Sequence, residues 1–208
     1  MTISDRKERE FRRREDDILA AALALFNRDD WQSVTIEQIA RKAEIGKGTI
    51  YKHFATKDEI YARLVIDFHR RMIADLRAVD RGRAPLKVIG AFMDVFWNAH
   101  ARAPEYRRLI RYCRREDFRR VIGRESSREL ESIDAEAMEI LVPVLERGIR
   151  EGSIVRGPVE SLLLGLHASM IGLLELEGAE CMNSDLTPER KFKEVREFSL
   201  RAIARTAR

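Results

Sequence analysis

The residues whose types and spacing suggest chemistry lie in the segment TIEQIARKAEIGKGTIYKHFATK, from Thr35 to Lys57. A short stretch of it carries cationic, hydroxyl and phenol side chains and no acidic ones: Lys47, Thr49, Tyr51, Lys52 and His53. Such groups donate hydrogen bonds to phosphate oxygens and to acceptor atoms on base edges. Gly48 has no side chain and would let the backbone approach closely. We therefore expect this stretch to lie in a groove of DNA.

A helix that reads DNA also needs a face that holds it to its own domain. Ile50 and Phe54 are four residues apart and supply that face. The remaining side chains then point toward base edges and phosphates, with His53 and Lys57 better placed for phosphates. Thr35 can offer a phosphate its hydroxyl or a helix N-terminal amide.

Helix-start signals define the elements on either side. Thr35 with Gln38, and Thr56 with Glu59, each match a capping box. Ile45–Gly46 is the expected turn, with Gly46 as the N-cap of the short helix that follows. The sequence thus predicts a helix-turn-helix over residues 35–54 and a longer helix directly after it.

Charge alone leaves a solvated face on a structural helix as an equal alternative, and the order of the residues favours DNA reading. The segment from Ile18 to Leu64, and GKGTIYKHFATKDEIY above all, resembles the helix-turn-helix of the tetracycline-repressor (TetR) family of bacterial transcriptional regulators. The resemblance covers about the first third of the chain. It implies that these positions lie at the DNA: Thr35, Lys47, Thr49, Tyr51, Lys52, His53 and Lys57. Gly46 departs mildly from the family pattern, which often has a small polar cap there.

The whole chain reads as helical. It has 208 residues, is 45% hydrophobic and 36% charged, and shows apolar residues at helical spacing with no strand-like alternation. We expect an all-α fold with an N-terminal three-helix DNA-binding domain and a larger C-terminal helical domain for ligand binding and dimerisation. The expected boundaries are a basic arm at 1–11, the DNA-binding domain at 12–72 and the C-terminal domain at 80–208. Later helices are expected to open at these signals: Pro85, Pro104, Gly157–Pro158 and Thr187–Pro188.

Composition also excludes several classes of protein. The two cysteines, Cys113 and Cys181, are far apart and form no CxxC motif, so we expect neither a disulfide framework nor a zinc site, and a cytoplasmic location. The charged N-terminus is not a signal peptide, and no uninterrupted run of about 18 apolar residues predicts a membrane span. There is no phosphate-binding loop, metal-ligand cluster or nucleophile motif, so we expect no enzyme, metal or cofactor.

A dimer interface is expected in the last two helices. Gly165, Ala168 and Gly172 form a stripe of small residues that would let another helix approach closely. Together with Phe192, Val195 and Phe198 the stripe could build a four-helix bundle between two subunits. The alternative is that this apolar helix is the central core helix of its own domain.

The resemblance further implies a small-molecule effector in the C-terminal domain. Candidate lining residues for an apolar pocket with a few polar groups are Phe92, Met93, Phe96, Trp97, His100, Tyr106, Tyr112, Met138, His167 and Met170. The alternative is that these residues form a plain core.

Arginines dominate the middle of the chain, where residues 61–126 hold 16 Lys/Arg and 8 Asp/Glu. Most of this excess comes from Arg107, Arg108, Arg111, Arg114, Arg115, Arg119, Arg120 and Arg124. Three interpretations stay open: an anion site, a surface that pairs with the acidic last third, or a solvated helix face. The last is the simplest.

The sequence as a whole predicts a regulator, in most such cases a repressor, that binds a palindromic operator as a homodimer and is released by a small hydrophobic effector. The alternative is an architectural or division-related DNA-binding protein of the same fold without a ligand. A cavity in the larger domain would favour the regulator.

Overall fold

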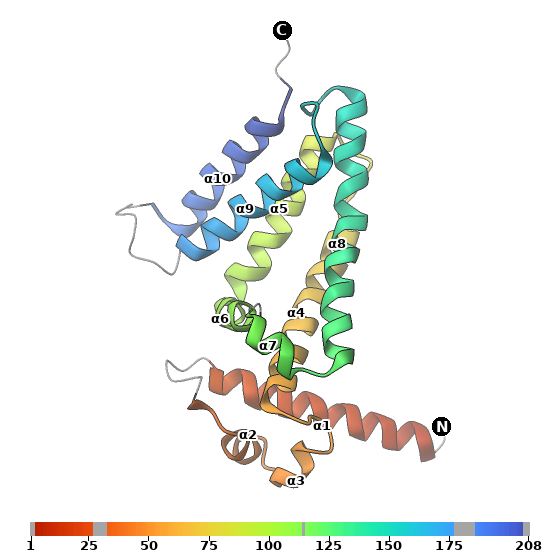
Figure 1. Ribbon diagram of the computed structural model, residues 1–208, viewed down its shortest axis with the longest axis vertical. Coiled ribbons are helices and arrows are strands. Elements are labelled where there is room, and N and C mark those ends of the chain that lie inside the picture. The colour runs from red at the N-terminus through yellow and green to blue at the C-terminus, as the bar shows by residue number, and fades with distance from the viewer. Residues whose placement is uncertain (1–2, 27–32, 114, 177–185, 206–208) are drawn as a thin grey trace. The chain divides into compact units, whose positions relative to one another are not determined.

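The computed structural model describes residues 3–26, 33–113, 115–176 and 186–205, and its regular elements in these ranges are all helices (Figure 1). They are α1 (Ile3–Phe26), α2 (Ile36–Lys42), α3 (Lys47–Ile50), α4 (Lys57–Ala78), α5 (Pro85–Arg102), α6 (Pro104–Cys113), α7 (Glu116–Val121), α8 (Arg124–Glu151), α9 (Val159–Leu176) and α10 (Pro188–Ile203). One isolated bridge joins Ile154 and Ala204. The predicted all-α fold class is confirmed.

The helices pack into two compact units. Unit 1 comprises Met1–His69 and Glu105–Glu131, and unit 2 comprises Arg70–Pro104 and Ser132–Arg208. Two long helices, α4 and α8, therefore contribute residues to both units. From the sequence we expected two domains, at residues 12–72 and 80–208, and these boundaries stay predictions. No sequence pattern indicated that residues 105–131 pack with the N-terminal segment.

In unit 1, aliphatic side chains hold the helix-turn-helix against α1 and the start of α4. Ile18, Ile39, Ile50 and Ile60 are fully buried, and Phe54 is nearly so. The predicted anchoring of α3 by Ile50 and Phe54 is therefore confirmed.

The turn between α2 and α3 follows from local hydrogen bonding. The Thr35 hydroxyl accepts from the amide of Gln38 and the Gln38 side chain accepts from the Thr35 amide, as predicted for a capping box. At the other end of α2, the Glu44 amide donates to the Arg41 carbonyl and the Ile45 amide to the Ala40 carbonyl. This pair of bonds is a Schellman motif. It places Glu44 in the left-handed region, at φ 55°.

The N-terminal segment expected as a basic arm is part of α1, since that helix begins at Ile3. All residues from Asp5 to Arg13 are exposed, so this part of α1 is surrounded by solvent. We expected α1 to end near Asn27–Asp30; it is described as far as Phe26, and the expected end lies outside the described residues.

Unit 2 is built around α5, α9 and α10, with α10 packed on both others. Trp97 of α5 stacks on Phe192 of α10, with ring centroids 4.9 Å apart, and Arg196 makes two hydrogen bonds to Asp94 at 2.7 and 3.1 Å. The predicted helix starts at Pro85 and Thr187 are confirmed. Helix α8 continues through Pro143. The kink expected at this proline stays a prediction.

α9 needs a correction. Polar residues interrupt its apolar run, so no membrane-length segment was expected there. Among the described residues, however, α9 is the one helix long and apolar enough to cross a bilayer, with a mean hydropathy of 1.5. The core helix of a globular domain meets the same criterion, and one side of α9 packs on α5 and α10 through Leu166, Met170 and Leu173.

Candidate nucleic-acid interface and apolar cavity

α3 and the turn after it present the predicted polar face to solvent. Lys47, Gly48, Tyr51 and Lys52 are exposed and Thr49 is half-buried. A Cβ added to Gly48 would meet no other atom within 4 Å, so packing inside the protein does not require glycine there. Open space in front of Gly48 is what a close approach to DNA needs.

Lys47 is not a free cation in this structure. Its ammonium forms an ion pair with the Glu37 carboxylate of α2, and it lies 5.8 Å from the centre of the Tyr51 ring. The hydrogen bond with Glu37 raises the pKa of Lys47, and the same bond lowers the pKa of Glu37. A DNA phosphate that binds Lys47 would therefore compete with Glu37.

His53 is built into the packing between α3 and α1. Its ring stacks on Phe11 with centroids 4.0 Å apart, and its Nδ1 is buried with no hydrogen-bond partner among the described residues. Burial lowers the pKa of His53, opposed in part by the nearby Glu15. The neutral ring is thus favoured, and the expected phosphate contact stays a prediction.

Lys57 and Thr35 both have partners within the motif. The Lys57 ammonium donates to the Val34 carbonyl at 2.9 Å and lies 5.6 Å from the centre of the Tyr61 ring. The Thr35 hydroxyl accepts the capping bond of α2. These two residues hold the motif together, and their contacts to DNA stay predictions.

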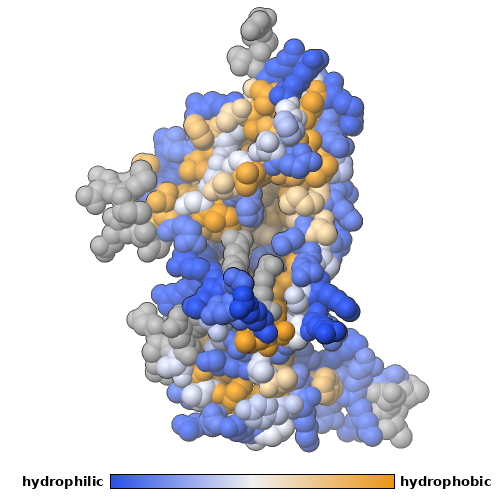
Figure 2. Space-filling model, viewed as in Figure 1, coloured by the Kyte–Doolittle hydropathy of each residue, from blue (hydrophilic) through white to orange (hydrophobic). Residues whose placement is uncertain are grey.

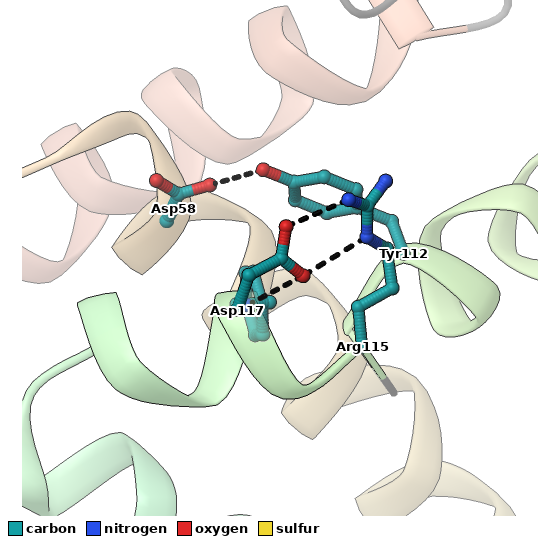
Figure 3. A network of polar contacts seen from close by, with 5 residues as sticks. Asp58, Tyr112, Arg115 and Asp117 are labelled. Atoms are coloured by element: carbon teal, nitrogen blue, oxygen red, sulfur yellow. Dashed lines mark hydrogen bonds and ion pairs between the residues drawn. The ribbon is translucent and has the colours of Figure 1, made fainter.

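The Arg-rich stretch is partly neutralised by its own acidic residues. Arg115 makes a two-bond fork to Asp117, at 2.9 and 2.7 Å (Figure 3). Arg120 pairs with Glu116. Arg107 is half-buried, and Arg108, Arg111 and Arg124 are exposed. Arg114 and the Arg119 side chain lie outside what the structure describes. For Arg115 and Arg120, paired surface arginines fit better than an anion site.

Tyr112 belongs to unit 1 and is not among the residues that line the apolar cavity of unit 2. Its hydroxyl donates to Asp58 at 2.9 Å (Figure 3). Its ring meets Tyr61 and Phe118 edge-on. Burial and the Asp58 carboxylate raise the pKa of Tyr112 to about 12, so the phenol stays protonated. Tyr106, another candidate, stacks on Phe68 in the same unit at 4.7 Å.

An apolar cavity of about 100 Å³ lies within unit 2. It is lined by Leu76, Ile89, Phe92, Met93, Phe96, Met138, Leu141, Leu163, Leu166, His167 and Met170. Six of these were predicted: Phe92, Met93, Phe96, Met138, His167 and Met170. Trp97 instead stacks on Phe192, and the buried His100 pairs with the Phe96 carbonyl at 2.8 Å. The five aliphatic residues were missed, since at helical spacing they are indistinguishable from core.

The predicted dimer residues divide into two groups. Gly165, Ala168 and Phe198 are exposed, Phe198 by 65%. Gly172, Phe192 and Val195 are half-buried, and a Cβ on Gly165 or Gly172 would meet nothing within 4 Å. Leu164, beside the stripe, is 70% exposed. Figure 2 shows further hydrophobic patches among charged side chains on the face it displays.

Both the sequence and the fold of this chain are similar to those of known transcriptional regulators. Residues 18–64 match the family model described as bacterial regulatory proteins, tetR family. The HTH-type transcriptional regulator TcmR of Streptomyces glaucescens is 26% identical over 141 residues, which cover 68% of this chain and 51% of TcmR. A crystal structure of a bacterial regulatory protein in the tetR family from Rhodococcus RHA1 aligns with a TM-score of 0.75 at 18% identity, over 93% of this chain and 98% of that one. Residues 18–64 therefore carry the helix-turn-helix segment of the TetR family.

The segment of this chain that matches TcmR spans about half the length of TcmR. A second solved structure, the transcriptional regulator FadR from Bacillus subtilis in complex with stearoyl-CoA, aligns with a TM-score of 0.69 at 18% identity, over 90% of this chain and 98% of FadR. At that identity the likeness concerns the fold. The family model ends within α4, so the cavity and the exposed face of α9 lie outside it.

Proposed function

We propose that the protein is a ligand-responsive transcriptional repressor that binds a palindromic DNA operator as a homodimer. A small, mainly hydrophobic effector releases it from the DNA. The observation that carries the proposal is the outward polar face of α3 above its buried Ile50 and Phe54 anchor. The match of residues 18–64 to the TetR family supports it.

In this proposal α3 enters the major groove. Lys47, Gly48, Thr49 and Tyr51 face base edges, because the N-terminal part of a recognition helix lies closest to them. Lys52 contacts phosphate, and Thr35, His53 and Lys57 support the motif at the backbone. A single motif of this size reads few base pairs, so two copies are needed about 34–36 Å apart.

The second copy docks on α9 and α10. Leu164, Gly165, Ala168 and Phe198 leave apolar surface uncovered in one chain, and the small residues allow close helix approach. Extended apolar surface on a water-exposed face is a mark of an interaction site.

The effector occupies the cavity of unit 2. Its lining is almost wholly apolar, with His167 as a polar group, which suits an aliphatic or aromatic ligand. The FadR complex contains stearoyl-CoA, and a thioester of this kind is one candidate class, but a cavity of about 100 Å³ has room only for a short part of the acyl chain unless it widens on binding. A cavity also favours the regulator over an architectural protein of the same fold, which needs none.

The DNA claim is tested by anisotropy titration against a duplex selected from a random library. Lys52→Ala should weaken binding and reduce the slope of log K against log salt by about 1, because one phosphate contact is lost. Lys87→Ala, an exposed lysine of unit 2, is the matched control and should change neither. An unchanged slope and affinity for Lys52→Ala would remove that residue from the DNA surface.

The effector claim is tested with a library of fatty acids, acyl-CoA thioesters and aromatic acids. Compounds that bind should raise the melting temperature and release the duplex. Met93→Trp, which fills the cavity, should abolish release and keep duplex binding. No response in melting or release across the library would favour the architectural alternative.

A further inference from the structure

Glu59 has a role that its sequence position does not suggest. It is the third residue of α4, and its amide donates to the Thr56 hydroxyl at 3.2 Å, as in half of a capping box. The predicted return bond from its carboxylate is not what the structure shows. One carboxylate oxygen instead accepts from the Gly123 amide, and the other accepts from the Ser126 hydroxyl at 2.6 Å.

These contacts cap a different helix, α8. Gly123 precedes its first residue, and the Ser127 amide donates to the Gly123 carbonyl at 3.1 Å, which marks Gly123 as the N-cap. Glycine offers no side-chain acceptor to the unpaired amides of the first turn. The Glu59 carboxylate instead accepts from the amide of the N-cap residue and from the Ser126 hydroxyl, and it places a negative charge at the positive end of a 28-residue helix.

The fit between the two residues is steric as well. A Cβ added to Gly123 would lie 2.8 Å from a carboxylate oxygen of Glu59, closer than real Cβ atoms come. A side chain at position 123 would therefore force the Glu59 carboxylate to shift from its present place.

Neighbouring residues of α4 bind the same segment. Asp58 accepts from the Tyr112 hydroxyl (Figure 3), and Arg63 lies 3.6 Å from the Glu129 carboxylate in the second turn of α8. All three contacts lie within unit 1. They fix the first turns of α4 to α6 and α8.

The same two helices also line the cavity. α4 starts three residues after Phe54 of the DNA-reading motif and carries Leu76 of the cavity lining near its other end. α8 starts at the Glu59 contact and carries Met138 and Leu141 of the lining. A displacement of α8 that is carried along the helix to its first turn would either move the start of α4 or break the Glu59 cap.

We infer that Glu59 is a positioning residue that couples the cavity to the DNA-reading motif by capping α8 from the first turn of α4. The inference rests on the proposed function, because it assigns the route between the two proposed sites. Coupling of binding sites is reciprocal, so DNA binding must also change the cavity segments. That reciprocity allows a test without an identified effector.

The test is hydrogen exchange of the full chain with and without the selected duplex, read in the cavity-lining peptides of α8 and α4. In the wild type, duplex should slow exchange there about 5-fold or more, the lower end of ordinary coupling. Glu59→Ala should keep duplex affinity within a few-fold and lose this protection. Glu59→Gln keeps an acceptor for the Gly123 amide and should restore part of it. Gly123→Ala, which displaces the carboxylate, should behave like Glu59→Ala.

Glu125→Ala is the matched control, because it removes the same charge from the first turn of α8 and leaves the Glu59 contacts in place. It should behave like the wild type. Full duplex-induced protection in Glu59→Ala and Gly123→Ala, or equal loss in Glu125→Ala, would overturn the inference. A wild type that binds no selected duplex would instead overturn the proposed function, and the inference with it.

Discussion

At the scale of single residues, Lys47 and His53 both lie in surroundings that a basic DNA-reading helix would not by itself suggest. Lys47 is held by Glu37, and His53 is covered by Phe11. The Glu37 carboxylate partly neutralises the positive charge that Lys47 would present to DNA. Burial of His53 lowers its pKa and so disfavours its protonated, positively charged form. Each has a consequence that can be measured.

Glu37→Gln should strengthen duplex binding roughly 3- to 10-fold at low salt, because Lys47 is released and a negative charge beside the DNA is removed. The measurement is the anisotropy titration across a salt series. Glu160→Gln, the same charge change in α9, should have a much smaller effect. Equal effects of the two variants would show that Glu37 does not mask Lys47.

The stability of unit 1 should depend on pH through His53. Burial lowers the pKa of His53 below its ordinary value of about 6.5. The neutral His53 ring therefore makes its full contribution to the free energy of unfolding above that pH. The contribution falls as the pH decreases through the lower folded pKa, since the unfolded chain binds the proton first. Urea unfolding should show this loss between pH 7.5 and 5. Phe11→Ala removes the cover and should flatten the profile; an unchanged profile would exclude His53 as its source.

At the scale of elements, what sequence could predict was local. Capping residues and prolines predicted the starts of α2, α5, α6 and α10, because these signals act within one turn. The Ile50 and Phe54 anchor followed from helical spacing. The partners of Glu59, His53 and Tyr112 were missed because each lies on a distant segment. Tyr112 was assigned to the ligand site on its aromatic character alone, and its hydrogen bond to Asp58 explains why it lies elsewhere.

The turn of the helix-turn-helix gives a prediction at this scale. Glu44 occupies a left-handed conformation that costs a non-glycine residue about 1 kcal/mol or more. Glu44→Gly should stabilise the protein by about 0.5–1 kcal/mol after the entropy of the added glycine is subtracted. Lys42→Gly, at the last residue of α2, should destabilise it by up to about 1 kcal/mol. Urea denaturation checks both, and destabilisation by Glu44→Gly would contradict the assignment of the turn.

At the scale of the whole molecule, the uncovered apolar side of α9 and α10 is the feature that one chain does not explain. Phe198→Glu places a charge on this surface and should convert a dimer into a monomer in sedimentation equilibrium. Val121→Glu changes another exposed apolar residue, in α7 (54% exposed, against 65% for Phe198), and should leave the dimer intact. A dimer that survives Phe198→Glu would place the interface elsewhere.

The central claim is that two copies of α3 read a two-fold symmetric DNA site. The measurement that tests it most directly is selection of the full chain on a random duplex library, followed by sequencing. The account predicts a palindromic consensus with half-site centres about 10 base pairs apart, lost when Lys47, Tyr51 and Lys52 are replaced together by alanine. No enrichment over random duplex, or the same consensus from the triple variant, would contradict it.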